Sequence, residues 1–312
     1  MRLTERSGLL LVTCAAILWA TVGVATQLVP GAADISPELY GFARTAIAGP
    51  ILLALAWMVR QRNAPTGLNM RRKELFVFAL SSIVFQLCLF RSFAEVGVTV
   101  TVFLTVCLPP VFAVAWALMS GRAALSPEAG AALGLAVAGL SSFATARGTA
   151  LPTEVIYLCL PIVASGAFVV MSFSARTLAQ TAAPLEVAGA GLTLSSLLLL
   201  PIIPWFLPSG RIAASVGIDA NLLLLLVYLG LGPTALAYFC YCAGMARCRS
   251  AISGLIATMI EPMVAAALAM VLLHERLAIG ELFGCLLLML SMAVLWQGEQ
   301  PKLTPAMTDP AE

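Results

Sequence analysis

Apolar stretches of about 20 residues, separated by short polar connections, recur from one end of the chain to the other. An α-helix rises about 1.5 Å per residue, so each stretch is long enough to cross a hydrocarbon core about 30 Å thick. Membrane β-strands would instead appear as short alternating segments, which this sequence lacks. We therefore predict an all-α membrane protein with ten transmembrane helices, at residues 8–28, 37–59, 75–94, 98–119, 127–147, 153–175, 184–207, 221–243, 250–273 and 279–297.

One of these stretches, Ala251–Arg276, carries an acid close to its middle. Glu261 lies roughly 16 Å into the membrane, counted along the helix. A carboxylate at that depth costs about 2.5–3.5 kcal/mol, so it needs a partner, a proton or a watery cavity. Pro262 follows, and because proline has no N–H, the carbonyl of Thr258 loses its helical partner. The pattern predicts a helix broken near the membrane midplane.

A second stretch, Val98–Arg122, has the same organisation, and a shift of 152 positions places Pro110 on Pro262. We expect this helix to be broken as well. Ten helices in two units give five helices per unit, and an odd number inverts the second unit relative to the first. We predict two inverted five-helix repeats, at residues 1–148 and 149–298, followed by a cytoplasmic tail at 299–312. Sites in such proteins lie near the midplane, between the repeats.

The composition excludes other classes of protein. Of the 312 residues, 61% are hydrophobic and 10% are charged, whereas a soluble domain carries about 25% charged residues. The net charge of +2, without a basic tract, gives no reason to expect a nucleic acid as a partner. The eight cysteines form no metal-ligand pattern, and the sequence has no phosphate-binding G-x-x-x-x-G-K-[ST] loop. We expect no metal site, no cofactor and no ATP-driven step within this chain.

Lysine and arginine residues near the helix ends predict the orientation, because cytoplasmic loops are enriched in both. If the N-terminus is inside, twelve of these residues fall on the cytoplasmic side, and only Arg91, Arg147, Arg211 and Arg276 fall outside. We predict a multi-pass protein of the inner (plasma) membrane with both termini in the cytoplasm.

The second half of the chain resembles the EamA-type members of the drug/metabolite transporter superfamily. Their pattern is a tyrosine-bearing helix, a short basic turn, E-P-x-x-A in the ninth helix, and G/H-E-x-L before the tenth. Here the corresponding residues are Tyr238, Glu261-Pro262, Ala265 and His274-Glu275-Arg276-Leu277. The resemblance implies a ten-helix transporter, with the amino-acid/metabolite exporters as the first candidates.

The first half matches the same family through three features. Trp19 stands where the family's first helix has tryptophan-glycine, although Ala20 replaces the glycine. Arg44 corresponds to the arginine of the second helix, and Pro109-Pro110 to the proline of the fourth. The superfamily also carries nucleotide sugars, sugar phosphates and drugs, so the resemblance specifies the fold more closely than the substrate.

Five residues are our candidates for substrate binding: Trp19, Gln86, Ser165, Tyr238 and Glu261. The two aromatic rings would stack on a substrate, and Gln86 and Ser165 would hydrogen-bond to it. Glu261 would be a proton-responsive or cation-binding group. Each residue also has a structural interpretation, because polar side chains join helices within membranes and a carboxyl group can tie a broken helix to its neighbour.

Three prolines, Pro109, Pro110 and Pro262, are candidate hinges. Proline is common in membrane helices, so each is also compatible with a simple kink. In the functional interpretation, the carbonyls that the prolines leave without helical partners face a substrate ammonium group.

Arg44 lies about 10 Å from the expected outer surface, counted along its helix. It would bind a substrate carboxylate, or it would extend outward and pair with an acid near the outer helix ends, such as Glu95 or Glu154. We favour the second interpretation from the sequence.

These features predict a secondary transporter rather than an enzyme. We expect it to export small neutral or zwitterionic metabolites, amino acids first, by alternating access through a central pocket. The alternative is an exporter of cationic drugs with Glu261 as the counter-ion. An enzyme would need a catalytic constellation, and a scaffold would not need an acid and broken helices at the midplane. The partners are a small-molecule substrate and the lipid bilayer, with proton coupling left open.

Overall fold

The computed structural model describes residues 2–29, 36–62, 70–120, 127–146, 157–206, 220–248, 251–258, 260–274 and 278–297. Within these ranges the ordered elements are all helices and no strand occurs. Eight helical units are long and apolar enough to cross a membrane, and two shorter apolar stretches at 130–139 and 279–291 accompany them. Within the described residues, each of the ten predicted stretches overlaps one helix or consecutive helices.

Five helices form the first half of the chain: α1 (Arg2–Leu28), α2 (Pro37–Arg62), α3 (Arg72–Val96), α4 (Val98–Met119) and α5 (Pro127–Ala146).

The second half has more irregular helices. It begins with α7 (Cys159–Ala179) and α8 (Pro184–Leu199), which continues into the 3-10 helix η2 (Leu200–Phe206). The next unit consists of α9 (Ala220–Gly230), the π-helix η3 (Leu231–Leu236) and α10 (Ala237–Met245). It is followed by α11 (Ala251–Ala257), α12 (Ile260–Leu272) and α13 (Ile279–Gln297).

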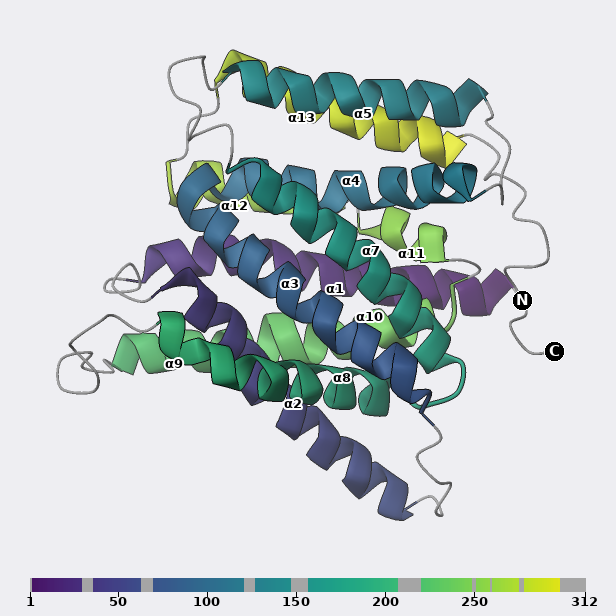
Figure 1. Cartoon of the computed structure of the whole chain (residues 1–312), viewed down its shortest axis with the longest axis vertical. Coiled ribbons are helices and arrows are strands. Elements are labelled where there is room, and N and C mark those ends of the chain that lie inside the picture. Colours follow the sequence, from purple (N-terminus) through teal and green to yellow (C-terminus); the bar gives the residue numbers. More distant parts are fainter. Residues whose placement is uncertain are drawn as a thin grey trace.

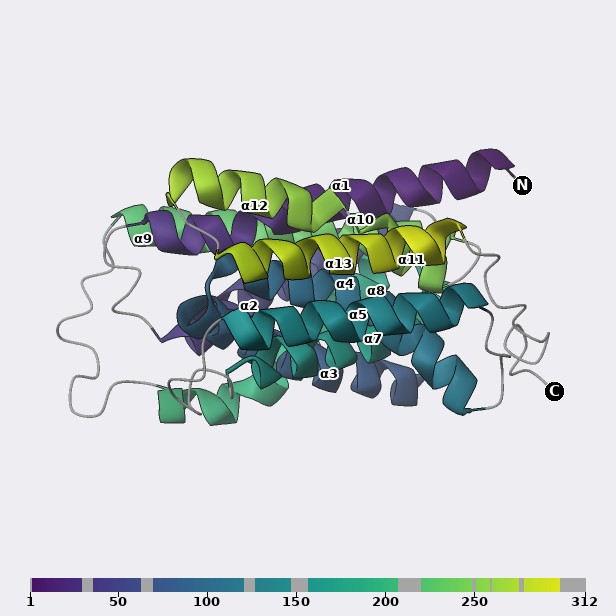
Figure 2. The same ribbon diagram turned by 90° about the horizontal axis from the view of Figure 1, so that it is seen from above.

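Helices from the two halves pack against each other throughout the bundle (Figure 1). The pair α5 and α13 lies along one edge, and α2 packs on α8 at the opposite edge. Between these pairs, α3 crosses α7 and α1 contacts both α10 and α12. Seen from above, α1 begins at the end of the bundle at which α13 ends (Figure 2). This placement is the one expected if the chain crosses the membrane an even number of times.

Small residues bring α2 and α8 close together. A Cβ atom added at Gly189 would lie 2.7 Å from the backbone nitrogen of Leu53, and one at Gly49 would lie 2.5 Å from the backbone nitrogen of Thr193. Helices in a membrane associate through such close backbone approach, because lipid tails are as apolar as leucine and supply no hydrophobic driving force. The α2–α8 contact therefore depends on two glycines, one from each helix.

The ninth helix is interrupted near the predicted place. The chain leaves α11 at Ala257 and resumes as α12 at Ile260, just before Pro262. We had expected the Thr258 carbonyl to be free. It is not, because the backbone N–H of Glu261 donates to it at 2.9 Å. A tighter i→i+3 turn thus replaces the hydrogen bond that Pro262 cannot make.

The expected break in the fourth helix is wrong. α4 is helical through both Pro109 and Pro110. The φ angle of proline suits a helix, so the main cost of the two prolines is the loss of two backbone N–H donors. Tight packing around the helix tolerates this loss. Both prolines are buried, and the Ser165 hydroxyl of α7 donates to the carbonyl of Leu104 at 2.9 Å, beside the affected turn.

Substitution of Gly189 tests the α2–α8 contact. Gly189→Ala forces backbone atoms apart, and overpacking of this kind costs about 1–3 kcal/mol. Gly166 in α7 is the matched control, because no heavy atom lies within 4 Å of its added Cβ. Both substitutions gain the same helix propensity, about 0.8–1 kcal/mol. We expect Gly189→Ala to lower the melting temperature in detergent and Gly166→Ala to keep or raise it. Equal melting temperatures would contradict the close approach.

Candidate functional site

A narrow cavity lies among six helices and is lined mainly by apolar side chains. The lining residues come from α1, α2, α3, α4, α7 and α12: Trp19, Val22, Arg44, Phe85, Leu89, Phe93, Thr105, Val106, Phe168 and Glu261. It leaves about 20 Å³ for the centres of water molecules, which is room for roughly one or two waters. An apolar lining with a few polar groups is typical of small-molecule sites, but the side chains must move before a metabolite fits here.

Arg44 supplies the positive charge of this cavity, although it is only 2% exposed. Its Nε donates to the hydroxyl of Thr234 at 2.6 Å, and its Nη2 donates to the carbonyl of Pro233 at 2.9 Å. The guanidinium carbon lies 5.6 Å from the ring centre of Phe90, a cation–π contact. The interpretation that Arg44 extends outward or pairs with Glu95 is therefore wrong. The side chain points into the bundle, where η3 offers two acceptors.

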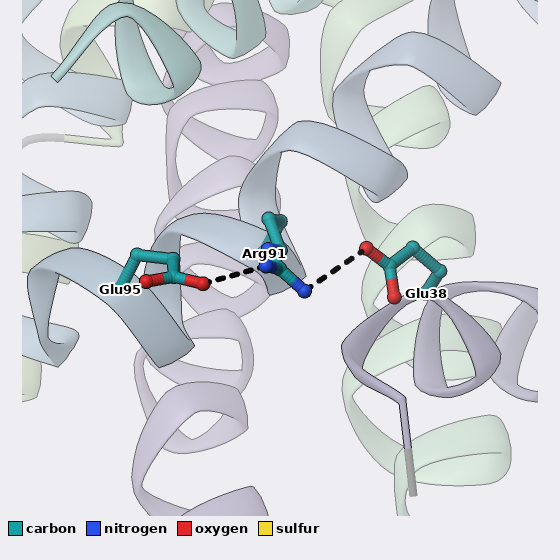
Figure 3. Close-up of polar contacts among 3 residues, drawn as sticks. All are labelled: Glu38, Arg91 and Glu95. Carbon is teal, nitrogen blue, oxygen red and sulfur yellow. Dashed lines mark ion pairs between the residues drawn. The ribbon is translucent and has the colours of Figure 1, made fainter. Parts of the chain in front are cut away.

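Glu95 pairs with another arginine, Arg91 (Figure 3). The two charged groups lie 2.7 Å apart along α3, and a second contact of 3.9 Å joins Arg91 to Glu38 near the start of α2. The Arg91 side chain is 43% exposed, so this cluster is worth little to stability. The other acid proposed for Arg44, Glu154, lies outside the described residues.

Glu261 supplies the acidic group. It lies in the first turn of α12, where the helix dipole favours an anion, and its partly buried side chain lines the cavity. The Glu261 carboxyl group and the Arg44 guanidinium group line the same cavity and interact electrostatically. Within the described part of the chain, no ion pair or side-chain hydrogen bond occupies the Glu261 carboxylate. The acid singled out from the sequence thus lines a cavity.

Aromatic rings form one side of the cavity. The ring centre of Trp19 lies 5.9 Å from that of Phe168, 5.4 Å from that of Tyr238 and 5.1 Å from that of Tyr241. Phe168 in turn lies 5.2 Å from Phe85. The indole Nε1 of Trp19 is buried without a hydrogen-bond partner among the described residues. Of the two predicted aromatic residues, Trp19 lines the cavity directly and Tyr238 packs behind it.

The remaining predicted site residues lie beside the cavity rather than in its lining. Gln86 Nε2 donates to the Tyr238 hydroxyl at 3.4 Å, and both residues are 1% exposed. Ser165 is fully buried and donates to two backbone carbonyls, those of Leu104 and Pro161. The Gln86–Tyr238 contact joins α3 to α10, and the Ser165–Leu104 contact joins α7 to α4.

Sequence reasoning missed several residues of the site. Phe85, Leu89, Phe93 and Phe168 resemble any other membrane-helix residue, and only packing shows that they line the cavity. Thr234, which holds Arg44, has a weak sequence signal: it follows the Gly-Pro pair at 232–233 inside an apolar run.

The sequence model of the EamA-like transporter family matches residues 6–145 and, a second time, residues 154–297. The chain belongs to the EamA-like transporter family. Members of this family are membrane transporters rather than enzymes, so this EamA-like protein is a multi-pass membrane transporter of small molecules. No curated protein sequence matches it. A solved crystal structure aligns with 93% of this chain and 96% of its own at 20% identity, with a TM-score of 0.63. That likeness shows the fold alone.

Proposed function

We propose that this EamA-like protein is a secondary transporter that exports small neutral or zwitterionic metabolites, amino acids first, by alternating access through the central cavity. The observation that carries the proposal is that one basic and one acidic residue, Arg44 and Glu261, line the same small cavity. A free amino acid has the complementary pair of charges. Its carboxylate would bind to Arg44, its ammonium group to Glu261, and its side chain would lie among the aromatic rings.

Charge balance favours a zwitterion over the alternatives. Transfer of a single charge into a low-dielectric site is costly unless an opposite charge meets it. A cationic drug would satisfy Glu261 but would also bring a positive charge toward Arg44. A sugar phosphate or nucleotide sugar would bring one or two negative charges to a cavity with a single arginine and an acid. The cationic-drug exporter remains the second candidate because Glu261 has no ion-pair partner within the described residues.

The packing of the helices supports two structurally equivalent halves. In the two halves, α1 corresponds to α7, α2 to α8, α3 to α10, α4 to α12 and α5 to α13. If each helix is exchanged for its counterpart, the contact of α3 with α7 becomes that of α10 with α1. The contact of α4 with α7 becomes that of α12 with α1, and the pairs α2–α8 and α5–α13 map onto themselves. Gln86 and Tyr238, which hydrogen-bond to each other, are 152 positions apart, the shift that aligns Pro110 with Pro262. We infer inverted repeats at residues 1–148 and 149–298.

Alternating access would use the irregular helices of this arrangement. The ninth unit is already divided between α11 and α12, so rotation of α12 relative to α11 changes the position of Glu261 without unwinding a regular helix. Pro262 is the hinge that this division supports best. Pro109 and Pro110 lie in a continuous helix, where the missing donors allow bending at lower cost.

The proposed orientation places both termini in the cytoplasm of a cell with an inner membrane, from the bias of lysine and arginine. We expect a single cysteine introduced at Gln297, in a cysteine-free variant, to react with a membrane-impermeant thiol reagent only after the cells are opened. Reaction in intact cells would overturn this orientation.

Counterflow into proteoliposomes tests the substrate class. We expect exchange of methionine, phenylalanine and threonine, but not of UDP-glucose or glucose phosphate. Exchange of phosphorylated solutes without amino acids would overturn the proposal, and exchange of organic cations alone would establish the second candidate. The same assay with and without a pH gradient tests proton coupling. If Glu261 carries the proton, Glu261→Gln abolishes the effect of the gradient while exchange persists.

A further inference from the structure

The irregular helical turn at η3 has a local cause in the sequence. Pro233 has no N–H, so the carbonyl of Leu229, four residues earlier, cannot accept its regular helical hydrogen bond. The hydroxyl of Thr234 donates to that carbonyl instead, at 2.6 Å. The N–H of Ala237 reaches back to the carbonyl of Gly232, which is the i→i+5 pattern of a π-helix. The carbonyl of Pro233 thereby loses the donor that an α-helix would give it.

Arg44 uses both groups that this turn leaves open. The Thr234 oxygen, whose proton points to Leu229, accepts from Nε at 2.6 Å, and the Pro233 carbonyl accepts from Nη2 at 2.9 Å. The backbone approaches α2 closely here, since a Cβ atom added at Gly230 would lie 2.5 Å from the side chain of Ile47. This close packing holds the start of η3 against α2, the helix that carries Arg44.

These contacts orient the guanidinium group and leave one of its nitrogens available. Phe90 covers one face, while Nε and Nη2 bind η3. Nη1 has no hydrogen-bond partner within the described residues, and Arg44 lines the cavity that Glu261 also lines. A fixed guanidinium with free N–H groups is suited to a planar carboxylate, because the geometry of both groups matches.

We infer that the π-turn formed by Pro233 and Thr234 makes Arg44 the carboxylate receptor of the cavity. Pro233 and Thr234 are positioning residues, because neither lines the cavity and both act through Arg44. This inference rests on the proposed function and deepens it: the transporter selects substrates that bear a carboxylate, and the selection is set by a turn outside the binding surface.

The test compares methionine with methioninamide, which keeps the amine and the side chain but lacks the carboxylate. Inhibition constants of both compounds are measured against exchange of labelled methionine in proteoliposomes. We expect Thr234→Val to raise the constant for methionine about tenfold, the effect of one hydrogen bond to a charged group, with the maximal rate and the constant for methioninamide unchanged. Thr234→Ser keeps the hydroxyl and should behave as the unmodified protein does.

Pro233→Ala is the second variant, in case Thr234→Val folds poorly. It restores an N–H for the carbonyl of Leu229 and favours a regular helix, so thermal stability should not fall. In a regular helix the carbonyl at position 233 accepts a backbone hydrogen bond and no longer binds Arg44. The inhibition constant for methionine should therefore still rise.

The outcomes separate this inference from the proposed function. If both variants leave the methionine constant unchanged, or raise it equally for methioninamide, the inference is wrong while amino-acid exchange by the unmodified protein still supports the proposed function. If the unmodified protein exchanges no amino acid, the proposed function fails and the inference fails with it.

Discussion

The burial of a permanent positive charge is the constraint on which the rest of the site depends. A guanidinium group cannot be neutralised inside a protein, so Arg44 must find acceptors and a counter-charge within the bundle. Thr234 and Pro233 supply the acceptors, and Glu261 supplies the opposite charge across the cavity. The acid is stabilised in turn by Arg44 and by the first turn of α12. Each charge makes the other less costly to bury.

Proline changes the backbone hydrogen bonding near the cavity. The chain has 10% charged residues, so few charged side chains are available within the helices. Each mid-helix proline removes a donor and thereby changes which backbone carbonyls can bind something else. At Pro233 the open carbonyl holds Arg44, and at Pro262 a tighter turn places Glu261 at the start of α12. At Pro109 and Pro110 the affected carbonyls belong to Thr105 and Val106, which line the cavity.

The helices could be predicted from the sequence because the membrane imposes their length and hydropathy. Glu261 could be placed in a pocket for the same reason, since an acid at that depth needs a special environment. The inward direction of the Arg44 side chain could not be predicted, because depth along a helix says nothing about which way a side chain points. That direction depends on η3, a turn about 190 residues away in sequence whose hydrogen bonds follow from a single proline. The continuity of α4 was missed because the sequence shows only that each proline removes a hydrogen bond. Whether the helix then breaks depends on packing against neighbouring helices, which the sequence does not show.

We propose that Arg44 and Glu261 recognise opposite ends of one substrate. Isothermal titration of purified Arg44→Gln and Glu261→Gln variants tests it most directly, with methionine, methioninamide and the hydroxy acid that replaces the amine of methionine by a hydroxyl group. We predict a crosswise result. Arg44→Gln should lose the preference for methionine over the amide but keep the preference over the hydroxy acid, and Glu261→Gln should do the reverse. Equal loss of affinity for all three ligands in both variants would contradict the account.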